Sequence, residues 1–200
     1  MWRLGPAWQD EERLAREWRA ATPFPHFVVD DFVPADVLPG LLAVVDEEPV
    51  SDYRGDIFAF EATAPEPRTA TFSGLRDAFA DVLVGPLQRI TGKEVQRADM
   101  RAYAYRAGHH LLPHTDHQQG VGRVLAYAYY LPSPEPPDGG ELELFRCATE
   151  RGEIVATVSA RLIEPRSNRL VVFEVGDVSL HQVREVCAGL RISLAGWFYP

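Results

Sequence analysis

The stretch "LQRITGKEVQRADMRAYAYR", residues 87–106, contains the point where the hydrophobic pattern of the chain changes. Before Gly92, apolar residues recur every three or four positions, the spacing of one helix face, and after it they alternate every two positions, as in a strand. Glycine often follows the last turn of a helix. We therefore divide the sequence into a helical support region, residues 1–92, and a strand-rich core, residues 93–200.

On either side of this point, the patterns predict helices first and then a series of strands. The expected helices cover 7–21, 34–47 with a disturbance at Pro39, and a segment that runs from a cap at Ser73 to Gly92. Strands are expected at 26–32, 95–106, 123–131, 141–145, 153–159, 168–174 and 190–198. This order predicts one α+β, mainly β domain over residues 1–200, with helices covering one side of a curled sheet or barrel.

Composition and charge restrict the possible partners. The net charge of −9 argues against binding to nucleic acid, because phosphate contacts need clustered Lys and Arg, but it suits a basic protein partner. Two cysteines are too few for a disulfide framework. The start of the chain has no signal-peptide pattern, and no apolar run is long enough to span a bilayer. We expect a cytoplasmic protein that makes no membrane contact.

Candidate metal ligands occur in "LLPHTDHQQG", residues 111–120, where His114 and Asp116 are two positions apart. Side chains at this spacing in an extended segment point the same way, so both can reach one ion. The pair alone is weak evidence, because exposed polar residues near a turn would look the same. His181, far downstream, can complete two histidines and one carboxylate, the facial set that holds non-haem Fe(II) and leaves positions open.

The last strand places a charged residue on a face that looks buried. Alternation puts Arg191, Ser193, Ala195 and Trp197 together, opposite a second apolar face. A buried guanidinium needs an anion, which is either a bound carboxylate or a structural partner from a buried Asp or Glu. The strand 123–131 favours a bound carboxylate over a structural partner. The small residues on one of its faces leave room for a ligand, and the hydroxyl of Tyr130 lies at one end of that face.

The same alternation identifies further candidate pocket residues on strand 123–131 and on the strand that precedes it. Ala126, Ala128 and Tyr130 share a face, and Tyr105 on the preceding strand can add a second hydroxyl. Arg123 could contact a substrate at the barrel mouth, with a salt bridge as an equal alternative. His117 could face the substrate, with a solvent-exposed histidine as the alternative.

Taken together, these segments resemble the Fe(II)- and 2-oxoglutarate-dependent oxygenases. More narrowly, the chain is similar to the prolyl-4-hydroxylase-like group that includes the ribosomal prolyl hydroxylases of the Tpa/Ofd type, and the similarity covers nearly its whole length. The segments that carry the resemblance are "PFPHFVVDDFVP" (23–34), H-T-D (114–116), "RVLAYAYYL" (123–131), "GGELELF" (139–145), "NRLVVFEV" (168–175), "SLHQVREV" (179–186) and "RISLAGWFYP" (191–200).

The resemblance implies a double-stranded β-helix, a cupin-like jelly roll, with the N-terminal helices packed on one sheet. It implies roles for individual residues as well: His114, Asp116 and His181 as Fe(II) ligands; Arg191 and Ser193 on the distal carboxylate of 2-oxoglutarate; Tyr130 and Tyr105 on the same cosubstrate; Val183 and Trp197 as lining of the pocket beside the iron. A carboxylate at position 116 fills the place that a halogenase of this class leaves for chloride, so hydroxylation is expected.

The implied reaction consumes O2 and 2-oxoglutarate, releases succinate and CO2, and hydroxylates an unactivated C–H, with ascorbate as an optional reductant. We expect the target to be a prolyl residue of a protein. Tpa/Ofd-type proteins usually continue into a second barrel, whereas this sequence ends at Pro200, so a hydroxylase of a free amino acid or a natural-product intermediate is an alternative. A non-catalytic barrel that binds metal and 2-oxoglutarate is an alternative of another class.

Two segments are candidates for lids over the mouth of the pocket, because long irregular loops on a rigid scaffold often carry recognition. They are 51–72, expected as a surface connection, and 132–140, a proline-rich loop closed by two glycines. Glu141 and Glu143 alternate with leucines and are expected on the wet face of a strand, and His109 is expected in an exposed turn. The oligomeric state is left open by the sequence.

Overall fold

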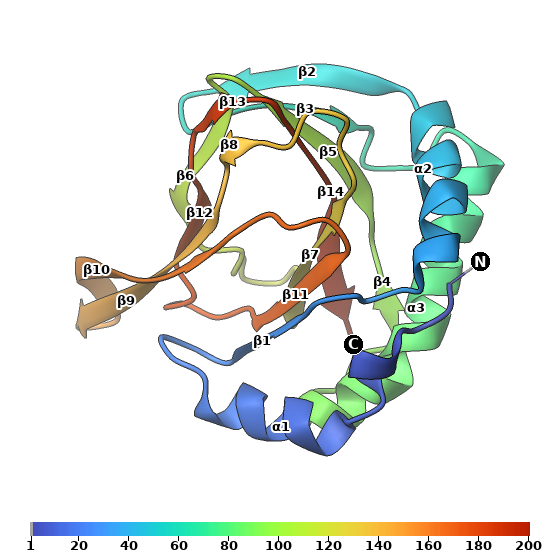
Figure 1. The fold of residues 1–200 in the computed structure, drawn as a ribbon. Helices are drawn as coiled ribbons and strands as arrows, with labels where there is room; N and C mark the ends of the chain where they lie inside the picture. Colours follow the sequence, from blue (N-terminus) through green and yellow to red (C-terminus); the bar gives the residue numbers. More distant parts are fainter. Residues whose placement is uncertain (1) are drawn as a thin grey trace.

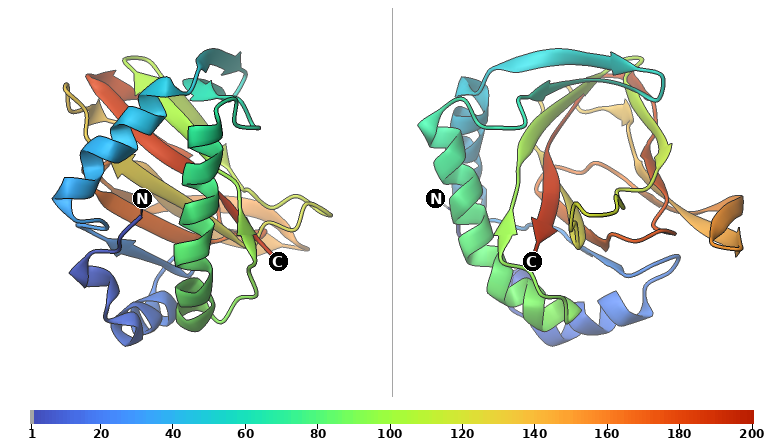
Figure 2. Two further views of the ribbon diagram at one scale, coloured as in Figure 1. Left: turned by 90° about the vertical axis from the view of Figure 1, so that its right-hand side faces the viewer. Right: turned by 180° about the vertical axis from the view of Figure 1, so that it is seen from behind.

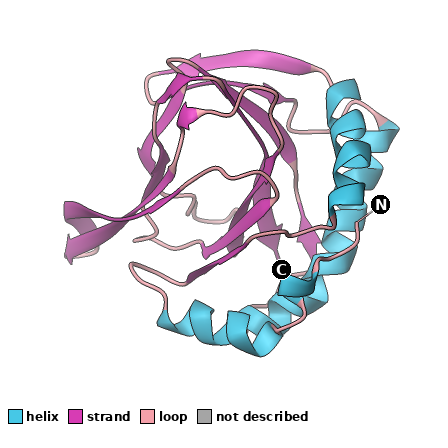
Figure 3. Cartoon of the chain, viewed as in Figure 1, coloured by secondary structure: helices cyan, strands magenta, loops and turns pink. Residues whose placement is uncertain are grey.

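The computed structural model describes residues 2–200, in which strands wind into a barrel and helices line one side of it (Figure 1, Figure 3). The helices are η1 Pro6–Trp8, α1 Glu11–Ala20, η2 Ala35–Val37, α2 Leu38–Glu47 and α3 Ala70–Thr91. The strands are β1 His26–Val29, β2 Val50–Gly55, β3 Phe58–Thr63, β4 Arg97–Ala98, β5 Arg101–Arg106, β6 His110–His114, β7 Leu125–Leu131, β8 Asp138–Gly139, β9 Leu142–Glu150, β10 Glu153–Ile163, β11 Arg169–Glu174, β12 His181–Val183, β13 Val186–Ala188 and β14 Leu190–Tyr199.

The barrel has two antiparallel walls that the chain visits alternately. One wall has the order β1-β11-β7-β14-β5-β3, and the other has the order β6-β12-β9-β10, with β3 also pairing β6. Successive strands β5, β6, β7 and β9 therefore lie in different walls in turn, and β11, β12 and β14 do the same. This alternation is the topology of a double-stranded β-helix, so the predicted fold class is confirmed.

The helices cover the outer face of the wall that contains β7 and β14 (Figure 2). Tyr127 and Tyr129 of β7 point outward into this layer, where the ring of Phe79 from α3 lies 4.8 Å from that of Tyr127. Each fully buried Phe or Leu in such a layer contributes about 1.5–3 kcal/mol relative to an exposed one. The alternate residues Ala126 and Ala128 point into the barrel instead. The strand period thus separates a structural face from a face that is free for a ligand.

The third helix ends as predicted but begins earlier. Gly92 follows its last turn with a φ of 71° and its backbone N–H donates to the carbonyl of Gln88. The N-terminal cap is Thr69, whose hydroxyl accepts from the backbone N–H of Phe72, so the prediction of Ser73 as the cap was wrong. Thr69 and Ser73 both carry a hydroxyl that can cap a helix, and the sequence pattern did not distinguish the two.

The segment 51–72 is not an irregular connection. Its first part forms the hairpin of β2 and β3, which pairs onto β5 and β6 of the two walls. Five of the six residues of β2 are exposed, so this edge strand has no apolar alternation by which it could be recognised. The first 92 residues therefore supply strands as well as helices. A second difference is the length of β9 and β10, which form a ribbon that projects from the barrel (Figure 1).

Two further expectations about exposure were wrong. Glu143 is buried, because its carboxylate accepts a hydrogen bond of 2.7 Å from the Gln182 amide on the neighbouring strand β12. His109 is also buried, with its ring beside Arg54 of β2. Across residues 2–200, no helix carries an apolar stretch long enough to cross a bilayer. Cys147 and Cys187 are both free thiols.

Asn168 ties the N-terminal segment to the strand wall, and its loss is expected to lower stability. Its side-chain oxygen accepts from the Val33 N–H at 3.1 Å and from the Tyr129 hydroxyl at 2.9 Å, while its amide donates to the Val33 carbonyl at 2.8 Å. Asn168 is buried and has a φ of 62°, which alanine adopts poorly. We expect Asn168→Ala to lower the free energy of unfolding by about 2–4 kcal/mol.

Urea denaturation of Asn168→Ala would measure this loss, with Ser167→Ala as a control at the neighbouring exposed position. The control is expected to unfold within about 0.5 kcal/mol of the wild type. An Asn168→Ala protein as stable as the control would show that the hydrogen bonds of Asn168 do not stabilise the fold.

Candidate active site

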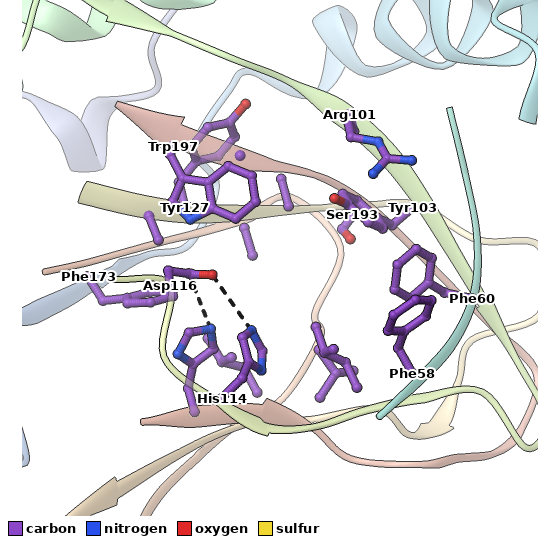
Figure 4. Close-up of a pocket in the computed structure, with 18 of the residues that line it drawn as sticks. Phe58, Phe60, Arg101, Tyr103, His114, Asp116, Tyr127, Phe173, Ser193 and Trp197 are labelled. Atoms are coloured by element: carbon purple, nitrogen blue, oxygen red, sulfur yellow. Dashed lines mark ion pairs between the residues drawn. The ribbon is translucent and has the colours of Figure 1, made fainter. Parts of the chain in front are cut away.

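Three predicted metal ligands meet at the ends of two paired strands. His114 is the last residue of β6 and His181 the first of β12, and the two are direct partners in the antiparallel register. Asp116 follows His114 by two positions. Its two carboxylate oxygens lie 3.7 Å from Nε2 of His114 and 3.4 Å from Nε2 of His181, as the dashed lines in Figure 4 show. One potential ligand atom from each residue lies within 4.8 Å of the others.

The backbone fixes which ring nitrogen of each histidine is free. Nδ1 of His114 lies 2.9 Å from the carbonyl of Leu112, and Nδ1 of His181 lies 2.9 Å from the carbonyl of Ser179. A carbonyl oxygen only accepts, so each Nδ1 carries a hydrogen and each Nε2 is the ring nitrogen that faces Asp116 and can bind a metal ion. Burial lowers the pKa of His181, with Asp116 raising it and His114 lowering it, so the neutral ring is favoured. Two neutral imidazoles and one carboxylate fit a divalent iron site with open positions.

Arg191 lies across the same cavity and lacks an anionic partner. It is 3% exposed, and the guanidinium carbon lies 4.8 Å from the ring centre of Tyr105 and 4.9 Å from that of Tyr130. One nitrogen donates to the Ser193 hydroxyl at 3.2 Å, while Nε has no hydrogen-bond partner. Within residues 2–200 no carboxylate lies at ion-pair distance from it, so the alternative of a structural pair with a buried Asp or Glu was wrong.

Two tyrosines complete this anion pocket. The hydroxyl of Tyr130 is buried without a partner, directly beside the strand that carries Arg191. Burial raises the pKa of Tyr105, so its hydroxyl stays protonated and can donate. Buried polar groups are normally hydrogen-bonded. An unpaired guanidinium beside such hydroxyls therefore fits a ligand carboxylate, which accepts from both kinds of donor.

The iron-ligand cluster and Arg191 line one cavity of about 480 Å³. Small side chains, Ala126, Ala128 and Ser193, form part of its wall, as the alternation of strand 123–131 and of the last strand predicted. Val183 and Trp197 also line it, as predicted. The cavity can therefore hold a cosubstrate between the metal ligands and the arginine, with further space toward the mouth.

The two predicted substrate-side residues differ in position. Arg123 lines the cavity, where its guanidinium lies 3.6 Å above the Trp197 ring and donates to the backbone carbonyl of Asp116 at 3.2 Å. His117 is exposed and pairs with Asp177 at 3.3 Å, away from the cavity lining, so the solvent-exposed alternative holds. Arg123 thus also holds the loop that carries Asp116.

Several residues of the mouth were missed by the sequence reasoning. They come from the β2–β3 hairpin and from β5: Tyr53, Ile57, Phe58, Phe60, Arg101 and Tyr103. Figure 4 labels Phe58, Phe60, Arg101 and Tyr103 among them. The ring centres of Phe58 and Phe60 lie 5.2 Å apart in a stacked pair. A signal for part of this set was present, because the alternation in "RAYAYR" puts Arg101, Tyr103 and Tyr105 on one face.

Comparison with known proteins places this geometry in a family. A family model described as the 2OG-Fe(II) oxygenase superfamily matches residues 100–199, which is half of the chain. This chain is a 2OG-Fe(II) oxygenase. Its cofactor is Fe(II), and its cosubstrates are 2-oxoglutarate and O2, which makes it an enzyme of the dioxygenase class. The His–Asp–His cluster fits the iron that the family uses.

Similar proteins of this superfamily include prolyl hydroxylases. "Prolyl 3-hydroxylase OGFOD1" of Mus musculus is 30% identical over 206 residues, covering 94% of this chain and 37% of the mouse protein. The chain thus spans little more than a third of that relative. A Pseudomonas putida prolyl-4-hydroxylase has the same fold, with a TM-score of 0.70 at 24% identity over 93% of this chain and 98% of that one. So does a Trichoplax adhaerens prolyl hydroxylase in complex with a hypoxia inducible factor peptide fragment, with a TM-score of 0.67 at 18% identity over 96% and 91%.

Proposed function

We propose that this oxygenase hydroxylates a prolyl residue of a protein or peptide and releases succinate and CO2. The observation that carries the proposal is the mouse prolyl 3-hydroxylase relative, which matches nearly the whole of this chain. The cavity supports it, because Phe58, Phe60 and Tyr103 form an aromatic wall in its lining, with flat apolar surfaces against which a proline ring can pack. We propose further that residues 1–200 act as one oxygenase domain.

The roles proposed for individual residues follow from their positions. His114, Asp116 and His181 would hold Fe(II). Arg191, with the hydroxyls of Ser193, Tyr130 and Tyr105, would bind the distal carboxylate of 2-oxoglutarate. Val183 and Trp197, which line the same cavity, would shape its wall beside the metal ligands. Bound Fe(II) would supply the site at which O2 oxidatively decarboxylates 2-oxoglutarate and the substrate carbon is hydroxylated.

Turnover assays with proline-containing peptides and with free proline test the substrate class. The proposal expects succinate formation together with a mass gain of one oxygen on a peptide proline, in the presence of Fe(II), 2-oxoglutarate and ascorbate. Oxidation of free proline alone would favour a small-molecule hydroxylase. A protein that binds Fe(II) and 2-oxoglutarate but forms no succinate with any substrate would be a non-catalytic barrel, and the proposal would fail.

Hydroxylation is expected to remain the outcome when chloride is abundant. Asp116 is buried against both histidines, so its carboxylate occupies the place that a halide ligand would need. Mass spectrometry of the product after turnover in chloride and in chloride-free buffer would check this. A chlorinated product would mean that Asp116 does not hold that position during the reaction.

A further inference from the structure

The cavity carries more positive charge than its cofactor and cosubstrate need. Among the charged groups that line it are three guanidiniums, from Arg101, Arg123 and Arg191, but Asp116 supplies the one carboxylate among the lining residues. When the site is loaded as proposed, the charges of Fe(II) and Arg191 are balanced by those of Asp116 and the 2-oxoglutarate dianion. Arg101 and Arg123 then remain without a counter-charge among the lining residues, although the chain as a whole carries −9.

Arg101 is held rigidly at the mouth of the cavity. Its Nε and Nη2 donate to the backbone carbonyl of Thr63 at 2.8 and 2.5 Å. Its guanidinium carbon lies 4.9 Å from the ring centre of Tyr53 and 5.3 Å from that of Tyr103. No carboxylate of the described chain lies within ion-pair distance of it. A cation that is already held and stacked loses little conformational entropy when it binds an anion, so Arg101 is preorganised to bind one.

The position of Arg101 relative to the metal ligands separates it from the other two arginines. Figure 4 shows Arg101 across the cavity from Asp116 and His114, on the side of Phe60. Arg123, in contrast, donates to the Asp116 backbone and stacks on Trp197, so its guanidinium already supports the metal loop. Arg101 is therefore the cation that a substrate would meet as it lies between the aromatic wall and the metal ligands.

We propose that Arg101 is a specificity-determining residue that pairs with a carboxylate of the substrate, close to the carbon that is hydroxylated. This inference rests on the proposed function and narrows its substrate class to a prolyl residue with a neighbouring carboxylate, which comes from an acidic side chain or from the α-carboxylate of a C-terminal proline. The acidic surface of the chain does not oppose this. Charges farther away than about 8–10 Å are largely screened at physiological salt, whereas Arg101 acts at contact.

Pairs of substrates that differ only in charge test the proposal. The pairs are a peptide with Asp beside the proline against the same peptide with Asn, and a peptide that ends in proline against the same peptide with a C-terminal amide. Two quantities are measured for each: the KM and kcat of succinate formation, and the affinity for the Fe(II) and 2-oxoglutarate holoenzyme without O2. We expect the wild type to favour one carboxylate-bearing substrate by about tenfold in KM and in affinity, with little change in kcat. The pair that shows the preference identifies the source of the carboxylate.

Variants of Arg101 separate recognition from a structural role. Arg101→Gln is expected to bring the preference to about one, and Arg101→Lys to retain part of it, because lysine keeps the charge without the planar fork. Arg97→Gln is the matched control, since Arg97 also stacks on a tyrosine, with 4.0 Å to the ring centre of Tyr199, but lies outside the cavity lining. The control is expected to keep the full preference.

Each other outcome has a defined meaning. A wild type that binds both members of each pair equally, or binds neither, would overturn the proposal. So would an Arg101→Gln protein that loses thermal stability and weakens all substrates alike, because Arg101 would then serve to anchor Thr63. If no proline substrate yields succinate while the binding preference persists, the proposed function fails and the carboxylate pairing stands.

Discussion

Asp116→Ala is expected to abolish the visible absorption that Fe(II) develops with a 2-oxo acid, and with it all succinate formation. Asp116 is the one carboxylate of the ligand cluster, and its oxygens face the free nitrogens of both histidines. Without it the site would keep two neutral imidazoles, and we expect the affinity for Fe(II) to fall by more than about 100-fold. Anaerobic titration of the metal-free protein with Fe(II) and 2-oxoglutarate would measure both effects.

Asp177→Ala provides the matched control for this experiment. It also removes a carboxylate beside a histidine, because Asp177 pairs with His117, but this exposed pair does not line the cavity. The control is expected to titrate as the wild type does. Absorption of normal intensity in Asp116→Ala would show that the iron is held elsewhere, and an equal loss in both variants would point to a general loss of folding.

The features that the sequence predicted are those that depend on local periodicity. The change of pattern at Gly92 marked the end of α3, and alternation along the last strand put Arg191 and Ser193 on the cavity side. The same alternation in strand 123–131 separated the small cavity residues from the outward tyrosines. The meeting of His114 with His181 lies beyond periodicity, since it depends on the pairing of β6 with β12. His181 was a candidate ligand from its residue type alone, and the family resemblance then supported it.

The features that were missed depend on tertiary contacts. In the strand β2 only Tyr53 is partly buried, so the strand has no apolar alternation, and it forms because β3 pairs with it and carries it against the barrel. Glu143 looks like a solvated residue until Gln182 is seen to bind it across the strand pair. Arg101 shares a face with Tyr105, but the sequence contains no sign of the β2–β3 hairpin that makes this face the mouth of the cavity.

Arg191→Gln is expected to raise the dissociation constant of 2-oxoglutarate by about 100-fold or more and to leave the apo protein at least as stable as the wild type. The loss of affinity follows from removing a buried charge-assisted pair with the ligand carboxylate. Removing one member of a buried ion pair usually lowers stability. Removing Arg191 is expected not to, because its guanidinium has no carboxylate partner of its own among the described residues. Removing an unpaired buried charge relieves a desolvation cost.

Arg169→Gln shows the opposite behaviour and serves as the control. Arg169 pairs with Asp30 through Nε at 2.6 Å and Nη2 at 2.9 Å, and it does not line the cavity. Its loss is expected to lower the Tm while the affinity for 2-oxoglutarate stays unchanged. Isothermal titration with 2-oxoglutarate and thermal unfolding of both variants would separate the cases. If Arg191→Gln lowered the Tm and bound 2-oxoglutarate normally, Arg191 would be a structural residue, because a ligand-binding arginine requires the reverse pattern.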